Sequence, residues 1–153
     1  MFKKILTFKQ TLLVACLLCT GFIAQSQTSA LTADEAAIKQ VIEEESKHFW
    51  GRDYKKWKKT WLHEDHVRWT VATKDGVRQF TSWEDWSAEV KSLFESSPEP
   101  QPYDVKKYNY KFRIYGDGAL VLFEQEAETK SRELRIMEKT NGKWKIAVVE
   151  AIY

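Results

Sequence analysis

The sequence has little cysteine and proline, and the positions of these few residues limit the chemistry of the chain. Both cysteines, Cys16 and Cys19, lie in an apolar segment near the N-terminus, so we expect neither a disulfide nor thiol chemistry in the rest of the chain. All three prolines fall between Pro98 and Pro102, where they predict a rigid connector rather than a domain boundary. We find no internal repeat and no low-complexity segment.

Long apolar runs are also scarce. The run from Thr11 to Ala24 is too short to span a bilayer comfortably, but it follows Met-Phe-Lys-Lys and suits a cleaved export signal. Ala24 and Ser26 provide the small side chains that a signal peptidase recognises. We therefore predict an export signal over 1–26 and a single domain over 27–153, periplasmic or secreted, with no membrane span.

Lipidation is an alternative fate for the N-terminal segment. The residues Leu13-Val14-Ala15-Cys16 resemble a lipoprotein attachment box, which would anchor the chain through Cys16. Only a very short apolar segment precedes Cys16, however, and the apolar run continues beyond it. This pattern favours the cleaved signal over the lipid anchor.

An excess of one charge sign is lacking as well. The chain has 24 Lys and Arg against 22 Asp and Glu, and three of the lysines lie in the predicted signal, which leaves 21 bases against 22 acids. A domain with a net charge of about −1 has no positive electrostatic field that would attract nucleic acid, so we exclude nucleic-acid binding.

Aromatic residues, in contrast, are abundant, and all seven tryptophans lie within 27–153. This aromatic content suits either a large core or an aromatic-lined cavity.

Three helices are expected in the first half of the domain. The first helix begins with a capping box at Thr32–Glu35 and ends at Gly51. An apolar stripe runs along it, and Glu45 falls on this stripe, so we expect its side chain to point inward. The second places Tyr54, Trp57 and Trp61 on one side, with lysines outward. After strands over 67–73 and 77–80, a capping box at Thr81–Glu84 begins the third helix, whose apolar stripe consists of Trp83, Trp86, Val90, Leu93 and Phe94.

Two histidines between the second helix and the first strand need separate consideration. His63 and His66 flank two acids, and on a helix they could share a metal ion. They lie at a turn, and the sequence implies no third ligand. We therefore predict neither a metal nor a cofactor.

The second half of the domain changes to a period of two. Tyr108, Tyr110, Phe112 and Ile114 alternate with polar residues, and a turn at 116–118 leads into a strand from 119 to about 129. Pairing Tyr115 with Ala119 would match apolar residues and place Glu124 near Tyr110, on the aromatic face. Alternatively, the strand leaves the core at that point and its acids are solvated.

The last hairpin is the clearest local signal. Two β-prone runs flank Asn141-Gly142, a pair that tolerates positive φ. A two-residue turn would set Glu133 opposite Glu150, so we prefer a three-residue loop. That register pairs Ile136 with Ile146 and places Arg132 beside Glu150.

The order of elements resembles the nuclear transport factor 2-like superfamily, which includes SnoaL-like polyketide cyclases and ketosteroid isomerases. The resemblance rests on the opening helix Ala36-Ala37-Ile38-Lys39-Gln40-Val41-Ile42, on the stretch from Asp53-Tyr54 to Asp65, and on Asn141 to Ile146. It implies an α+β fold in which a curved antiparallel sheet wraps on about three N-terminal helices, as a cystatin-like cone. It also implies a pocket in the cone and homodimers through the outer sheet face.

Two departures from family patterns prevent transfer of a catalytic mechanism. Val148 and Glu150 stand where one family pattern has histidines on the last strand. An isomerase's aspartate base with its tyrosine donor has no residue-by-residue match in this chain. The resemblance therefore implies the fold and the pocket, but no reaction.

The sequence supports three functional hypotheses. The first is a binding module whose cone holds a small apolar or ring-shaped ligand, with these candidate contacts: Trp61, Trp69, Trp83, Trp86, Tyr110 and Arg132. The second is an acid/base isomerase or dehydratase with Glu150 as first candidate for the base, Glu45 or Glu124 as second, and Tyr110 or His66 as hydrogen-bond donor. In the third, tryptophans fill the cone and the protein acts through a dimer or partner surface.

Overall fold

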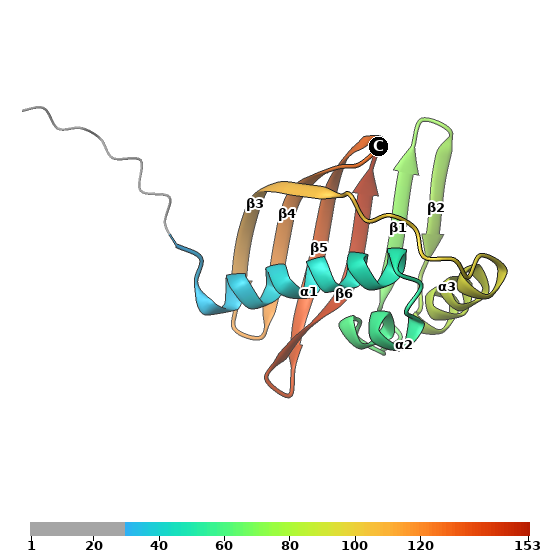
Figure 1. The fold of residues 1–153 in the computed structure, drawn as a ribbon. Helices are drawn as coiled ribbons and strands as arrows, with labels where there is room; N and C mark the ends of the chain where they lie inside the picture. Colours follow the sequence, from blue (N-terminus) through green and yellow to red (C-terminus); the bar gives the residue numbers. More distant parts are fainter. Residues whose placement is uncertain (1–29) are drawn as a thin grey trace, which may run out of the picture. The chain divides into compact units, whose positions relative to one another are not determined.

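The computed structural model describes residues 30–153 (Figure 1). The predicted export signal over 1–26 and the alternative lipid anchor at Cys16 lie outside the described residues. Within 30–153, no helix combines the length and the apolarity that crossing a membrane requires.

Helix α1, Ala33–Trp50, confirms the expected start, end and orientation. The Thr32 side chain accepts a hydrogen bond from the Glu35 backbone and Glu35 bonds back to Thr32, which satisfies two free N–H groups at the helix start. The buried face carries Ile38, Ile42 and, as predicted, Glu45, which is only 8% exposed.

The second helical segment is short and divides into α2, Tyr54–Trp57, and a 3₁₀ turn η1, Lys58–Thr60. The Asp53 side chain caps it by accepting from the Lys56 backbone N–H at 2.9 Å. Trp57 and Trp61 are buried, so the predicted aromatic side is confirmed.

The first hairpin and the third helix follow in the predicted order: β1 Arg68–Thr73, β2 Gly76–Phe80 and α3 Trp83–Ser96. The predicted capping box at Thr81 is off by one residue. Ser82 is the N-cap, and its hydroxyl accepts from the Asp85 backbone N–H at 3.1 Å. The helix buries Trp86, Val90 and Phe94.

Four long strands complete the described chain: β3 Lys106–Tyr115, β4 Gly118–Glu126, β5 Lys130–Thr140 and β6 Lys143–Ile152. They form the expected antiparallel meander, and β1 joins it by pairing parallel with β6, in the order β2-β1-β6-β5-β4-β3. The sheet curves, α1 crosses its concave face, and α2 and α3 lie at the β1–β2 end (Figure 1). The α+β cone is therefore confirmed for the described residues.

The preferred register of the last hairpin is wrong. The turn has two residues, Asn141 and Gly142, both with positive φ, and it pairs Thr140 with Lys143. A β-bulge then inserts one extra residue into β6, because Met137 pairs with Ile146 but Ile136 pairs with Val148. The bulge removes the clash that argued against the two-residue turn, since Glu133 now faces Ala151.

The register predicted for β3 and β4 is also off by one. Ile114 pairs with Ala119, and a second bulge lies at Asn109, whose φ is 57°. Tyr108 therefore pairs with Glu124 on the outer face of the sheet, and Lys107, opposite Gln125, turns inward. Glu124 therefore does not lie on the aromatic face with Tyr110, but the strand does not leave the sheet there either, because β4 stays paired on both sides as far as Glu126.

Candidate functional site

A cavity of about 120 Å³ lies between the second half of α1 and the concave face of the sheet. Its polar lining consists of Glu45 and Ser46 from α1, Gln125 from β4, and Glu133 and Arg135 from β5. Aromatic side chains close the remaining sides: Phe49, Trp50, Trp69, Trp86 and Tyr153. The cavity is therefore an aromatic chamber with charged groups on two opposite walls.

Glu133 and Arg135 form an ion pair on the sheet wall. Arg135 Nη2 lies 3.1 Å from Glu133 Oε2, and the two side chains are 6% and 2% exposed. The Ser131 hydroxyl donates to Glu133 Oε1 at 2.9 Å, and the guanidinium lies over the Phe123 ring at 5.6 Å. Burying these charges costs free energy that pairing only partly offsets, and removal of either partner strands the other.

Hydrogen-bond donors are left over on this wall. Arg135 Nε and Nη1 are buried and have no hydrogen-bond partner among the described residues, and the same holds for the Trp86 indole N–H. Buried N–H groups are nearly always bonded to protein or water, so water or another molecule in the cavity would complete the bonds of these donors.

Glu45 faces the chamber from the helix wall. Its Oε1 accepts from the Trp57 indole N–H at 2.9 Å, and the Ser46 hydroxyl lies 3.4 Å from its Oε2. The bond from Trp57 holds the carboxyl group in place, whereas its other oxygen, Oε2, has only the long contact with Ser46. Stacked indoles form the adjoining wall, because the Trp69 and Trp86 rings are 4.5 Å apart and 12° from parallel.

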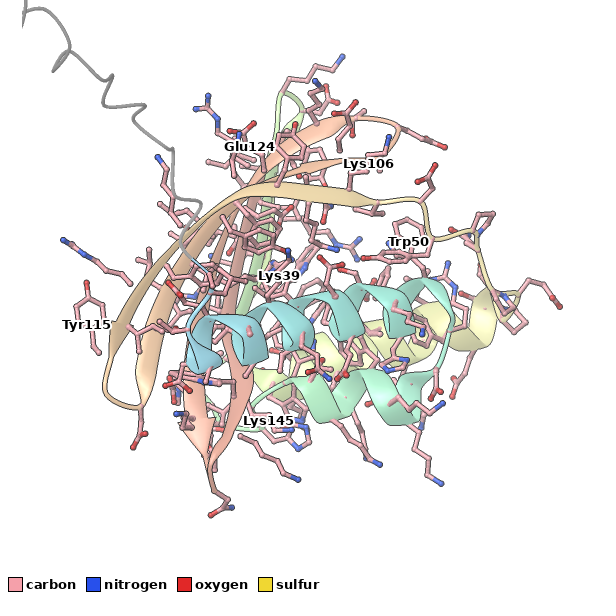
Figure 2. The ribbon with its side chains drawn as sticks, turned by 60° about the vertical axis from the view of Figure 1, so that its left-hand side comes forward. Lys39, Trp50, Lys106, Tyr115, Glu124 and Lys145 are labelled. Atoms are coloured by element: carbon pink, nitrogen blue, oxygen red, sulfur yellow. The ribbon has the colours of Figure 1, made fainter. Side chains whose placement is uncertain are left out.

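The chamber borders a wider depression of about 650 Å³, with which it shares Trp50, Gln125 and Tyr153. Residues of the connector between α3 and β3 form one side of this mouth, including Gln101 and Pro102. Figure 2 shows Trp50 at the end of α1, beside that connector, and the Gln101 backbone N–H donates to the Trp50 carbonyl at 2.9 Å. The chamber and the depression therefore adjoin at these three residues.

A closed polar network fastens the connector and β3 to α1. Glu43 accepts from the Tyr103 hydroxyl at 2.8 Å, from Lys107 Nζ at 3.2 Å and from the Tyr110 hydroxyl at 3.1 Å. Burial alone would raise the pKa of Glu43, but the Lys107 charge and these hydrogen bonds outweigh burial and hold the pKa below 4.5. Burial lowers the pKa of Lys107, whose side chain is fully buried.

Tyr153 brings a hydroxyl group to the same mouth. Burial raises the pKa of this tyrosine, and the negative charge of Glu133 adds to the shift, while a hydrogen bond with Ser131 and the charge of Arg135 oppose it. The phenol therefore stays protonated at neutral pH and can donate a hydrogen bond.

The structure brings together three of the sequence-derived candidates. Glu45, Trp69 and Trp86 line the chamber. Tyr110 packs on Phe123 and bonds to Glu43 in the neighbouring network, with Lys39 Nζ over its ring at 5.1 Å. Trp61 is buried among other indoles and does not line the chamber, and Trp83 stacks on His63 at 4.3 Å.

The remaining candidates lie elsewhere. Glu150 and Arg132 are exposed on the outer face of the sheet, because the bulge in β6 and the pairing of β5 turn them away from the cone. Glu124 shares that face and bonds to the Asn109 amide at 3.2 Å. His66 is exposed and pairs with Glu138 at 2.9 Å, so it cannot serve a cavity group as donor.

Sequence reasoning missed Glu133, Arg135, Lys107 and Tyr153. The available signal was the spacing Glu-x-Arg, which puts opposite charges on one face of a strand. Within 30–153, no group of three or more His, Cys, Asp or Glu side chains has a metal-binding arrangement.

Comparison with known proteins identifies solved structures that share this fold. No family model and no curated protein matches the chain. An NTF2-like protein from Cytophaga hutchinsonii matches with a TM-score of 0.59 at 18% identity, over 80% of this chain and 98% of that one. An NTF-2 like protein of unknown function from Silicibacter pomeroyi gives a TM-score of 0.60 at 14% identity, over 79% and 98%.

A third similar structure is a candidate calcium/calmodulin-dependent protein kinase type II association domain from Thiobacillus denitrificans. It matches with a TM-score of 0.58 at 11% identity, over 74% of this chain and 92% of that one. At such identities the likeness establishes the fold alone, and the fold is the predicted one.

The network around Glu43 predicts a pH-dependent contribution to stability. A carboxyl group with a lowered folded-state pKa stabilises the fold above its ordinary pKa, and that stabilisation disappears as the pH falls through the folded-state value. We expect Glu43→Gln to be less stable than the unsubstituted chain near pH 7, with a gap that closes as the pH falls below the lowered pKa of Glu43. Urea unfolding near neutral pH and below that pKa measures this gap.

A suitable control is Glu95→Gln, because Glu95 is exposed and only distantly paired with Lys91, at 3.9 Å. This variant should show a small gap at either pH. A gap for Glu43→Gln that stayed constant with pH would contradict the assigned role of Glu43.

Proposed function

We propose, on the premise of a nuclear transport factor 2-like fold, that residues 27–153 form an exported domain that binds a small, ring-shaped molecule inside the cone. The observation that carries this proposal is the set of unpaired, buried donors of Arg135 beside a chamber walled by stacked indoles. The chamber leaves space beside these donors, and a ligand oxygen placed there would satisfy them in place of water.

The charges of the chamber favour a neutral ligand with an accepting oxygen. Two carboxyl groups, Glu45 and Glu133, line it against the single guanidinium of Arg135. A ligand carboxylate would add a third acid to this lining, whereas a carbonyl or hydroxyl oxygen can accept from Arg135 without adding charge. The indole walls suit the flat apolar remainder of such a molecule.

The size of the chamber fits the polar end of the ligand. Its volume of about 120 Å³ equals roughly four water molecules at ~30 Å³ each. The oxygen-bearing ring would occupy the chamber, and any further substituent would extend into the wider mouth beside Trp50 and Tyr153.

Binding can be tested with phenol and benzamide as probes, read through the fluorescence of the chamber tryptophans. The double variant Glu133→Gln/Arg135→Met removes the donors without leaving one buried charge unpaired. We expect it to weaken binding about tenfold or more, since a hydrogen bond to a charged group contributes ~1.5–3 kcal/mol.

Arg132→Met is the matched control, because Arg132 lies three residues away on the exposed outer face. It should bind both probes like the unsubstituted chain. Equal affinity in the double variant, or tighter binding of benzoate than of benzamide, would contradict the proposed contact.

An acid/base isomerase or dehydratase is the second candidate function. One observation favours it: the Glu45 carboxyl group and the Tyr153 hydroxyl line the same chamber, so a base and a hydrogen-bond donor could reach one ligand. If a bound ketone exchanges its α-protons with solvent, Glu45→Gln should abolish the exchange and retain binding, which proton NMR can follow. Unchanged exchange would remove Glu45 from the mechanism.

We further propose that the protein is a homodimer through the outer sheet face. The centre of that face is apolar, and Leu122 and Ile136 are 40% and 38% exposed. One similar structure carries the name of an association domain. Native mass spectrometry should give a dimer, and Leu122→Lys/Ile136→Lys should give monomers, because unpaired lysines cannot be buried in such an interface.

Val77→Lys is the control for this experiment, since Val77 is 69% exposed on the edge strand β2, away from the proposed interface. It should remain dimeric. A monomeric unsubstituted chain would contradict the dimer.

The same measurement tests the export signal. A mass that included residues 1–26, in protein purified from its own host, would contradict cleavage of this segment.

A further inference from the structure

A second hollow, of about 560 Å³, lies on another side of α1 and shares no lining residue with the chamber. Three segments enclose it: the first half and end of α1, the α2–η1 segment, and the start of β6. Glu44 and Glu45 illustrate the separation, because these neighbours on α1 line the hollow and the chamber respectively. We call this hollow the lysine groove, after Lys56, Lys59, Lys143 and Lys145.

The lysine groove concentrates positive charge on a chain that is otherwise nearly balanced. Within residues 30–153, Lys59, Lys143 and Lys145 form no ion pair, although the chain elsewhere pairs many of its charges. Lys56 pairs with Asp53 at 3.1 Å. Two segments distant in sequence, η1 and the start of β6, thus bring three ammonium groups without an ion pair to one concave surface.

The acids of the groove are already engaged. Asp34 pairs with Lys139 at 2.7 Å and accepts from the Trp144 indole N–H at 2.8 Å, and these contacts, that with Lys139 first, hold the pKa of Asp34 low. Glu44 accepts from the Gln40 amide at 2.8 Å. If the negative charge of Glu44 is taken to neutralise one of the three lysines without an ion pair, the groove still has two uncompensated positive charges.

Lys145 is held at the centre of this arrangement. Its ammonium group donates to the Lys59 carbonyl, and Figure 2 shows the residue beside α1 and the neighbouring helical segment. Burial lowers the pKa of Lys145, the charges of Lys143 and Lys59 lower it further, and Glu44 acts in the opposite direction. An anion bound in the groove would relieve this repulsion.

We propose that the lysine groove binds the phosphate group of a small organic phosphate. Converging lysines act as point charges that suit a phosphate, which carries about −1.5 to −2 at pH 7. The groove is far larger than an inorganic ion, and Ala37, Val41 and Trp144 provide apolar lining for an organic group. The proposal does not depend on the ligand of the cone.

Phenyl phosphate and inorganic phosphate are the probes, titrated into ¹⁵N-labelled protein at constant ionic strength. We expect saturable amide shifts in 40–48, 56–60 and 143–145, and tighter binding of phenyl phosphate than of inorganic phosphate. The triple variant Lys59→Gln/Lys143→Gln/Lys145→Gln should lose at least tenfold in affinity for phenyl phosphate.

The matched control removes the same charge from exposed lysines that lie outside the groove and form no ion pair with any residue of 30–153: Lys55→Gln/Lys74→Gln/Lys106→Gln. It should change the affinity less than threefold, and urea unfolding of both triple variants confirms that each is folded. An equal loss in both would show a general charge effect and overturn the proposal. Shifts confined to the surroundings of Arg135, or no saturable binding, would also overturn it.

Discussion

One extra residue in β6 decides which side chains of the last strand enter the cone. Ile146 and Ala147 are consecutive and both buried, which is the local signature of the bulge. Beyond it, Val149 and Ala151 face inward and Glu150 faces outward. A regular two-residue hairpin would instead have directed Glu150 toward Glu133, and two carboxylates would have shared a buried wall. The charged pair of the chamber depends on this insertion.

The elements of the fold were predictable because their signals are local. Capping residues and apolar stripes located α1, the Asn141-Gly142 pair located the last turn, and the resemblance to cone-shaped proteins followed from the order of elements. The face of the sheet to which each strand residue points could not be predicted in the same way. Apolar and charged residues alternate along β5, and matching Ile136 with the apolar Ile146 favoured a register that the structure does not have, since Ile136 pairs with Val148 on the outer face.

The candidate site was therefore predicted from the helices better than from the sheet. Glu45 and Trp86 were placed by helical spacing, which tolerates small errors in an element's ends. Glu150, Glu124 and Arg132 were placed by strand pairing, where an error of one residue inverts every side chain. Two bulges, at Asn109 and Ala147, produce such inversions, and short sequence patterns do not reveal them.

The connector between α3 and β3 has a consequence for the thermodynamics of the cone. Its backbone is bonded to Trp50 through Gln101, and its Tyr103 hydroxyl is held by Glu43, so folding itself fixes this side of the rim to α1. Ordering a loop on association costs conformational entropy. For the proposed ligand, the connector would need no such ordering, and selectivity would rest on the shape of the mouth and on the positions of its polar groups rather than on closure of this segment.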